Sequence, residues 1–134
     1  MYKRQAAAQV VTPANIVPLQ IVLPPAPPVI TSMTLTRGVD VLTVNIIGYS
    51  DTRDMTQAAF HFTPATGQTI SNPDITLPAA VLFSSWYSTA PSQAYGSNFM
   101  YSQTFDLSAD QSTIGSVTVT LTNSAGASAS ATAD

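Results

Sequence analysis

The sequence predicts an all-β fold: an antiparallel sandwich of two sheets with about seven strands, preceded by an extended N-terminal arm. Three observations lead to this prediction. Strong helix formers are scarce, with no Glu and a single Lys in 134 residues. Thr, Val, Ile, Ser and aromatic residues, which strands prefer, are abundant. Short runs alternate apolar and polar residues with a period of two, and turn residues separate these runs.

The first two predicted strands form a hairpin. In ITSMTLT, residues 30–36, Met33 and Leu35 share one face. A turn with Gly38 as its pivot leads into the run VLTVNIIGYS, residues 41–50. This second strand is predicted to direct Leu42, Val44 and Ile46 into the core, and Thr43 and Asn45 away from it.

Two further strands are predicted in the middle of the chain. The run MTQAAFHFTPA alternates again, and the turn TPATGQ separates it from a short strand around Ile75 and Leu77 that Pro78 ends. The apolar run at residues 79–89 fits either a strand or one helical turn, and PSQAYGSN, residues 91–98, is predicted as a loop. The longer strand has Phe60 and Phe62 on one face, and Gln57 and His61 on the other.

The end of the chain alternates most clearly. FMYSQTFDL and SVTVTLTN are predicted strands, and Asn-Ser-Ala-Gly forms a turn with Gly126 in the left-handed position. The run ASASATA, residues 127–133, then pairs back as an edge strand. The first strand has Phe99, Tyr101, Gln103 and Phe105 on one face, and the second has Val117, Val119 and Leu121 on one face.

A resemblance supports this interpretation. The closing run TVTLTNSAGASASATA resembles the final hairpin of bacterial extracellular immunoglobulin-like domains, in which an Asn-x-x-Gly turn joins the last two strands. The run GYSDTRDMTQAAFHFTPATG is similar to modules that close long secreted bacterial proteins. The similarity covers residues 29–134 and implies an immunoglobulin-like β-sandwich and an extracellular or cell-surface location. It implies no catalytic residues.

The composition limits the classes of function. Charged residues make up only 8% of the chain, against roughly 25% in an average soluble domain, so copies meet little electrostatic repulsion. The net charge of -3 and the scarcity of Arg and Lys argue against nucleic-acid binding. No apolar run reaches the ~20 residues that span a bilayer. Because few groups titrate between acid and neutral pH, stability is predicted to change little from about pH 5 to 8.

The chain offers few residues for catalysis, and an enzyme is not predicted. Its single imidazole, His61, faces away from the predicted core. A glycosidase-like pair of carboxylates would have to be Asp51 with Asp54, or Asp106 with Asp110. No Cys is present to act as a nucleophile or thiolate ligand. We therefore assign no catalytic, cofactor-binding or metal-binding residue, and we expect no cofactor.

The run SDTRDM, residues 50–55, carries the densest charge. One interpretation is a calcium site in a loop. Calcium takes about six to eight oxygen ligands, however, and Asp51 and Asp54 supply too few. The favoured interpretation is that Arg53 pairs with one or both carboxylates and fixes the turn.

Aromatic residues gather in one part of the sequence: Trp86, Tyr87, Tyr95, Phe99 and Tyr101. Exposed aromatic rings can stack on sugars, so Trp86, Tyr87 and Tyr95 are candidate ligand-facing residues for a cell-surface or extracellular polysaccharide. A lone Trp in a sandwich more often anchors the core or clasps a loop, and we favour this interpretation.

The N-terminal part divides in two. Residues 1–8 are either the remainder of a secretory leader or an unstructured start. Residues 9–28 form an extended apolar arm, which ends in the stiff polyproline spacer PPAPP that is predicted to hold the arm away from its own domain. In the arm, Val17, Leu19, Ile21 and Leu23 make one face wholly apolar and alternate with Ile16, Pro18, Gln20 and Val22. The predicted donor-strand residues are Ile16, Val17, Leu19, Ile21, Val22 and Leu23.

The arm has three alternative positions: as the first strand of its own sandwich, as a linker, or along the open edge of a neighbouring copy. We favour the third, because a solvated linker needs no Ile, Val and Leu, and an exposed run of them would aggregate. The sequence thus predicts a non-catalytic extracellular structural subunit that assembles with copies of itself into a head-to-tail filament. The alternatives are a C-terminal spacer or adhesion module of a longer secreted protein, and a carbohydrate-binding module.

Overall fold

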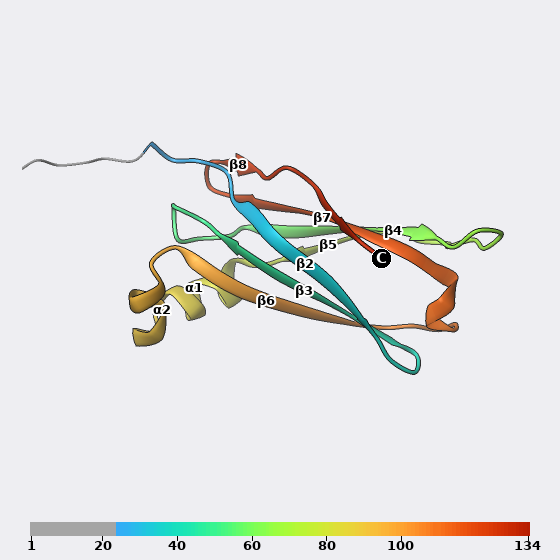
Figure 1. Cartoon of the computed structure of the whole chain (residues 1–134). Coiled ribbons are helices and arrows are strands. Elements are labelled where there is room, and N and C mark those ends of the chain that lie inside the picture. Colours follow the sequence, from blue (N-terminus) through green and yellow to red (C-terminus); the bar gives the residue numbers. More distant parts are fainter. Residues whose placement is uncertain (1–23) are drawn as a thin grey trace, which may run out of the picture.

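The computed structural model describes residues 24–134, and they fold into two antiparallel sheets that enclose one apolar core (Figure 1). One sheet has the strand order β2-β3-β6. The other has the order β5-β4-β7-β8, and β9 also pairs with β7. The strands are β2 (Val29–Arg37), β3 (Val41–Tyr49), β4 (Gln57–Pro64), β5 (Asp74–Pro78), β6 (Asn98–Asp106), β7 (Ile114–Asn123), β8 (Gly126–Ala127) and β9 (Ala131–Ala133). The prediction of an all-β sandwich is confirmed.

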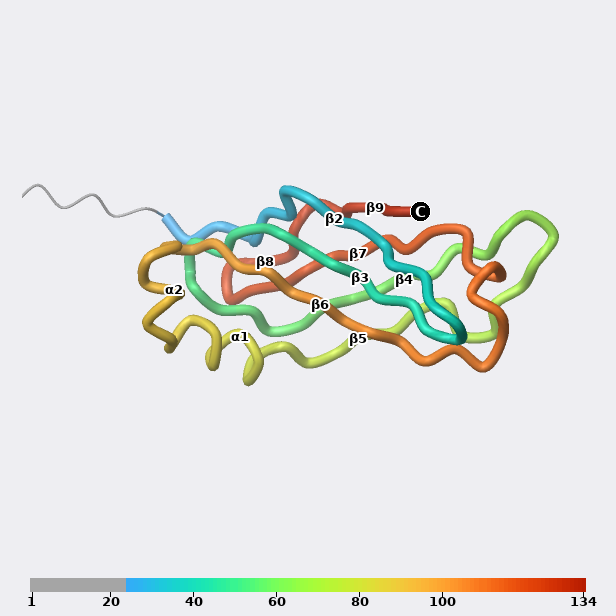
Figure 2. The backbone as a smooth tube through the Cα atoms, turned by 60° about the horizontal axis from the view of Figure 1, so that its bottom comes forward, coloured from blue at the N-terminus to red at the C-terminus, as the bar shows by residue number. Residues whose placement is uncertain are grey.

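The strand order determines which edges of the sheets are open. In a constant-type immunoglobulin domain the fourth strand pairs with the fifth and closes that edge of the first sheet. Here the fourth strand, β5, pairs with β4 in the second sheet instead. Within the described part of the chain, β6 therefore pairs only with β3 and forms an edge of the three-stranded sheet. Figure 2 shows β2 beside β9 on one flank of the sandwich, away from β5 and β6.

The core is built by the predicted alternation. The inward residues of β3 and β7 are fully buried, whereas Thr43, Asn45 and His61 are not. Phe105 of β6 packs edge-on against Phe60 and Phe62 of β4, with ring centroids 4.9 Å and 5.1 Å apart, and so joins the two sheets. The largest fully buried side chains include Phe60, Phe99, Leu42, Ile46, Met55 and Leu121.

Two short helices connect β5 to β6. The ambiguous run at residues 79–89 forms α1 (Ala80–Tyr87), which covers the core with Phe83. The prediction of a loop after it is wrong, because α2 (Ala90–Tyr95) forms there. The Thr89 side chain accepts a hydrogen bond from the Ser92 N–H, and Pro91 occupies the first turn, where its missing N–H costs nothing. In residues 24–134 no helix has the length and apolar character needed to cross a membrane.

The structure departs from the sequence-based prediction in the β2–β3 turn and in the last strand. In the β2–β3 hairpin the Gly38 N–H donates to Val41 O, but the left-handed residue is Asp40, with φ 57°. Asp tolerates this conformation better than most residues. The predicted last strand is divided into β8 and β9 because the Ser128 side chain accepts the N–H of Leu121 in place of a ladder carbonyl. A 3₁₀ turn at Gln111–Thr113 precedes β7.

The chain enters the sandwich through a fixed contact. Pro28 is fully buried, and Ala26 O accepts a hydrogen bond of 2.9 Å from Asn123 Nδ2 at the end of β7. Pro27 lies beside Gly126 in the turn that follows. The expectation that the whole PPAPP spacer stays clear of its own domain is therefore wrong for Ala26 and Pro28, whereas Pro24, Pro25 and Pro27 are exposed.

Candidate functional site

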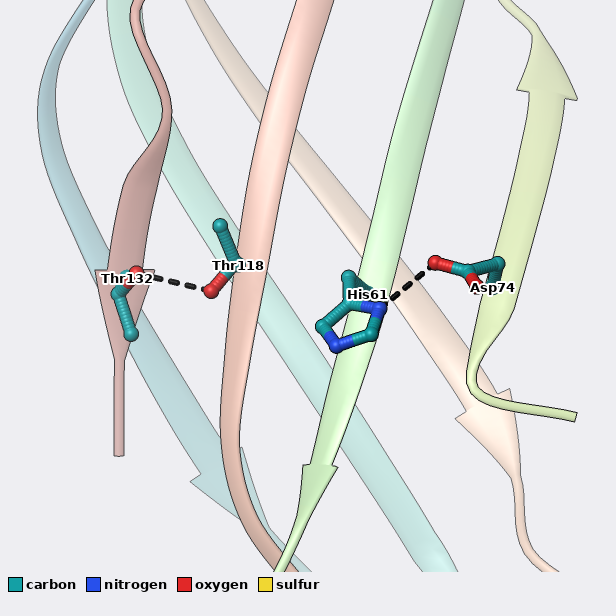
Figure 3. A network of polar contacts seen from close by, with 4 residues as sticks. All are labelled: His61, Asp74, Thr118 and Thr132. Atoms are coloured by element: carbon teal, nitrogen blue, oxygen red, sulfur yellow. Dashed lines mark hydrogen bonds and ion pairs between the residues drawn. The ribbon is translucent and has the colours of Figure 1, made fainter. Parts of the chain in front are cut away.

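A polar row crosses the outer face of the five-stranded sheet (Figure 3). His61 and Asp74 are register partners on β4 and β5, and their Nδ1 and Oδ1 atoms lie 2.7 Å apart. Thr118 is the partner of His61 on β7, and its hydroxyl is 2.9 Å from that of Thr132 on β9. His61 therefore lies on the outer face, as the sequence predicts.

The row has the composition of an Asp-His-Thr triad without its geometry. In a triad the nucleophile is hydrogen-bonded to the imidazole. Here Thr118 is bonded to Thr132 instead, and the His61 and Asp74 side chains are 52% and 74% exposed on an open sheet. An exposed pair of this kind contributes little to stability. The row is a cross-strand ladder of polar contacts.

Arg53 does not pair with the neighbouring carboxylates, so that expectation is wrong. Its guanidinium donates to Gly96 O, to Tyr87 O at 2.8 Å and to Ser92 Oγ at 3.2 Å, which fastens the loop after β3 to both helices. The Asp54 carboxylate accepts hydrogen bonds from the hydroxyls of Thr52 and Ser124. Residues 24–134 contain no group of three or more His, Cys, Asp or Glu side chains that could hold a metal ion.

Tyr87 points into the protein. It is 6% exposed, its hydroxyl donates to Ser97 O at 2.7 Å, and the Arg53 guanidinium lies 4.8 Å from its ring centroid. Burial raises the pKa of Tyr87 to about 12, against an opposing effect of Arg53, and burial also raises the pKa of Tyr101. Tyr87 thus belongs to the core and not to an exposed aromatic surface.

Ionisation of these buried tyrosines is expected to destabilise the fold at alkaline pH. Their folded pKa values lie above the value of about 10 for an unfolded tyrosine. Their contribution is therefore complete below about pH 10, and that of Tyr87 is lost as the pH rises towards 12. We expect urea melts to give a nearly constant free energy of unfolding from about pH 5 to 9 and a decline above 10. Above pH 10 the free energy of unfolding of Tyr87→Phe should decline less steeply than that of the parent. Tyr95→Phe, at an exposed tyrosine, is the matched control. A flat profile to pH 12 would contradict this assignment.

Trp86 and Tyr95 line an apolar groove on the outside of the three-stranded sheet. The groove has a volume of about 580 Å³ and lies where β2, β3 and β6 meet the helices. Trp86 is half-buried and its Nε1 donates to Asn98 O at 3.1 Å, whereas Tyr95 is 61% exposed. The floor includes the register partners Ile47 and Met100, which are 44% and 82% exposed. This concentration of apolar groups suits an apolar occupant better than a sugar.

A second hollow of about 250 Å³ continues from this groove along β6. It lies between β6 and α1, and the two hollows share Trp86, Phe99 and Met100. Its floor is closed by Phe83, whose ring packs edge-on against Phe99 at 5.0 Å and Tyr101 at 5.4 Å. The apolar surface therefore continues from the groove along the β6 edge.

Of the sheet edges in residues 24–134, β6 has the longest unbroken register, and α1 packs beside its first residues. Natural edges are protected by short strands, Pro, charges, bulges or a covering helix or loop. β5 has five residues between Asp74 and Pro78. β2 has an irregular register between Ile30 and Ser32, and the β8–β9 edge is interrupted at Ser128. β6 has nine residues in continuous register, with no Pro and with its one charged residue at the very end.

Peptide groups of β6 are available at this edge. Asn98 O accepts a hydrogen bond from the Trp86 side chain, whereas Ser97 O accepts one from the loop after β3. Because peptide groups alternate direction along a strand, those of Met100 and Ser102 face outward like that of Asn98. The open β6 edge and the adjoining apolar groove, which we call the β6 site, can therefore bond the backbone of an added strand and cover its apolar side chains.

Comparison of the chain with protein-family models, with curated proteins and with solved structures finds no match in any of the three. The features that bear on function are therefore the β6 site and the sequence. The predicted donor residues Ile16, Val17, Leu19, Ile21, Val22 and Leu23 lie outside the described residues. The sequence did not indicate that β6 is an edge. A visible signal was Met100, an apolar residue on the otherwise polar face of this strand, and the structure shows it to be exposed.

Proposed function

We propose that this chain is a non-catalytic, extracellular structural subunit that assembles head to tail by donating its N-terminal arm to an open sheet edge of the next copy. The observation that carries this proposal is the long edge of β6, in continuous register and beside an apolar groove. Added strands bind such edges through main-chain hydrogen bonds, and alternate side chains fill the adjacent pockets.

The rest of the sequence fits this arrangement. Residues 16–23 supply an apolar strand-like segment, and the low content of charged residues permits close approach of copies. The donor and acceptor surfaces are different, so the contact is heterologous and leaves a free donor and a free acceptor at the ends of every assembly. Repetition of such a contact gives an open fibre.

Deletion of residues 9–23 tests the proposal. The full chain is expected to form filaments visible by negative-stain electron microscopy, and the deletion variant is expected to sediment as a folded monomer. The monomer should melt at a lower temperature because the groove loses its cover. Deletion of residues 1–8 shortens the same terminus but spares the apolar segment, and it should leave assembly unchanged. Equal assembly of the parent and the 9–23 deletion variant would refute the proposal.

A second candidate function is a spacer or adhesion module within a longer secreted protein. The observation that favours it is the fixed entry of the chain at Ala26 and Pro28, held by Asn123 at the end of β7. The last strand pairs Ala133 with Val117 near the other end of β7. Entry and exit at opposite ends suit modules joined in series. A monomer at all concentrations, with or without residues 9–23, would support this candidate over the first.

A further inference from the structure

We infer that the donated strand runs antiparallel to β6 of a second copy and lays Val17, Leu19, Ile21 and Leu23 over the outer face of the sheet. This inference rests on the proposed function and deepens it. It follows from three facts: the direction of the β6 peptide groups, the position of Pro18 in the arm, and the location of exposed apolar side chains.

Pro18 determines which side of the donor strand can bond to β6. Proline has no N–H to donate, so within a sheet it occupies positions whose peptide nitrogen faces solvent. Residues two apart in a strand direct their peptide groups to the same side. The even-numbered residues of the arm, including Gln20, therefore face away from β6. The odd-numbered set, which includes Leu19 and Ile21, bonds to it.

This constraint couples strand direction to side-chain position. In an antiparallel pair, residues that exchange both hydrogen bonds stand directly opposite each other and project to the same face. The odd-numbered residues of the arm would then stand opposite Met100 and Ser102 and project to the outer face. In a parallel pair the bonds are slanted, and the same residues would stand opposite Tyr101 and project inward.

The structure favours the antiparallel arrangement because uncovered apolar surface lies on the outer face. Met100 is largely exposed there and Ile47 partly exposed, and the larger hollow of about 580 Å³ extends from them to Tyr95. On the inner side, Phe83 and Tyr101 are already buried against each other. In the antiparallel arrangement the wholly apolar face of the arm thus covers the larger exposed apolar surface, around Met100 and Ile47.

A second copy is the occupant because the chain enters on the opposite flank. Ala26 and Pro28 are held beside β7 and the β7–β8 turn, where β2 is the edge of the three-stranded sheet. β6 is the other edge of that sheet, with β3 between them. An arm that starts from the β2 edge through a stiff Pro24-Pro25 pair would have to cross the sheet to reach its own β6.

Disulfide trapping tests the inference, and the chain has no Cys of its own to interfere. One population of the full chain carries Ser102→Cys, and a second carries a single donor cysteine at Leu19, Gln20 or Ile21. Directly opposed residues in an antiparallel pair have Cα atoms about 5.5 Å apart, which suits a disulfide. Thr43→Cys on the central strand β3 replaces Ser102→Cys as the matched control for random collision.

We expect mixed filaments to form disulfide dimers at least about tenfold faster through Leu19→Cys or Ile21→Cys than through Gln20→Cys, and faster than with the Thr43→Cys control. Faster trapping through Gln20→Cys would indicate a parallel strand and overturn the inference. Filaments without any trapping at Ser102 would also overturn it, while leaving self-assembly intact. A chain with both cysteines that closes a disulfide within a monomer would show that the arm covers its own edge.

Discussion

Replacement of Asn123 by Ala is expected to lower the free energy of unfolding by about 3 kcal/mol. The Asn123 side chain is 3% exposed and bonded at both ends. Its Nδ2 donates to Ala26 O at 2.9 Å and Ser50 Oγ at 3.1 Å, and its Oδ1 accepts the N–H groups of Ala125 and Gly126. Truncation leaves these groups without partners in a site that excludes most water, and each buried orphan costs about 1 kcal/mol or more.

Asn45→Ala is the matched control for Asn123→Ala. Asn45 also takes part in two side-chain hydrogen bonds, to Thr36 and from Ser102, but these bonds lie on the exposed face of β3. Water can replace them, so the loss should stay below about 1 kcal/mol. Urea unfolding of both variants measures the difference. Equal losses would show that Asn123 does not hold the entering chain, and the second candidate function would lose its structural support.

The strands could be predicted from the sequence because each of them has one face in the core. β3, and β7 from Ser116 onward, alternate between buried and partly or fully exposed residues, and the period of two is visible in their letters alone. The signal for α2 was also present in the sequence. Thr89, Pro91 and Ser92 form a helix start, but the Gly and Ser residues around them suggested a loop.

Contacts that depend on strand order could not be predicted. The local spacing of Arg53 favoured a pair with Asp51 or Asp54, yet the fold brings carbonyl groups of the distant helices within its reach. The same holds for the β6 site. Its aromatic residues were visible as a group, but β6 becomes an edge only because β5 pairs with β4. Alternation defines the faces of a strand and not its neighbours.

Both arginines in residues 24–134 donate hydrogen bonds to backbone carbonyl groups of distant segments. Arg37 at the end of β2 donates to Gln111 O, Ile114 O and Gly115 O, which ties the three-stranded sheet to the start of β7. Arg53 does the same at the other end of the sandwich. In a chain with few charges, a guanidinium with five donors satisfies several carbonyls at loop ends without requiring a carboxylate. Loop ends at both ends of the sandwich are therefore fastened with few charged groups.

Replacement of Gly48 by Ala is expected to destabilise the fold by about 3 kcal/mol and to lower the melting temperature by roughly 10 °C. Gly48 lies on the inward face of β3 opposite Ile30, where the start of β2 crosses over it. A Cβ atom would lie 2.2 Å from Val29 O and 3.1 Å from the Phe99 ring. Because the nearer atom belongs to the backbone, no rotamer change can relieve the clash.

Gly115→Ala in β7 is the matched control for Gly48→Ala. Its Cβ would meet Pro64 O at 3.2 Å, a contact that a shift of a few tenths of an ångström relieves. It should therefore cost about 1 kcal/mol. The clash at Gly48 can be relieved only if β2 separates from β3 at Val29, which also disturbs the buried Pro28 before it. Amide hydrogen exchange should consequently show early opening of β2 in Gly48→Ala and not in Gly115→Ala. Unchanged protection of β2 with equal stability of both variants would contradict the close approach of the two strands.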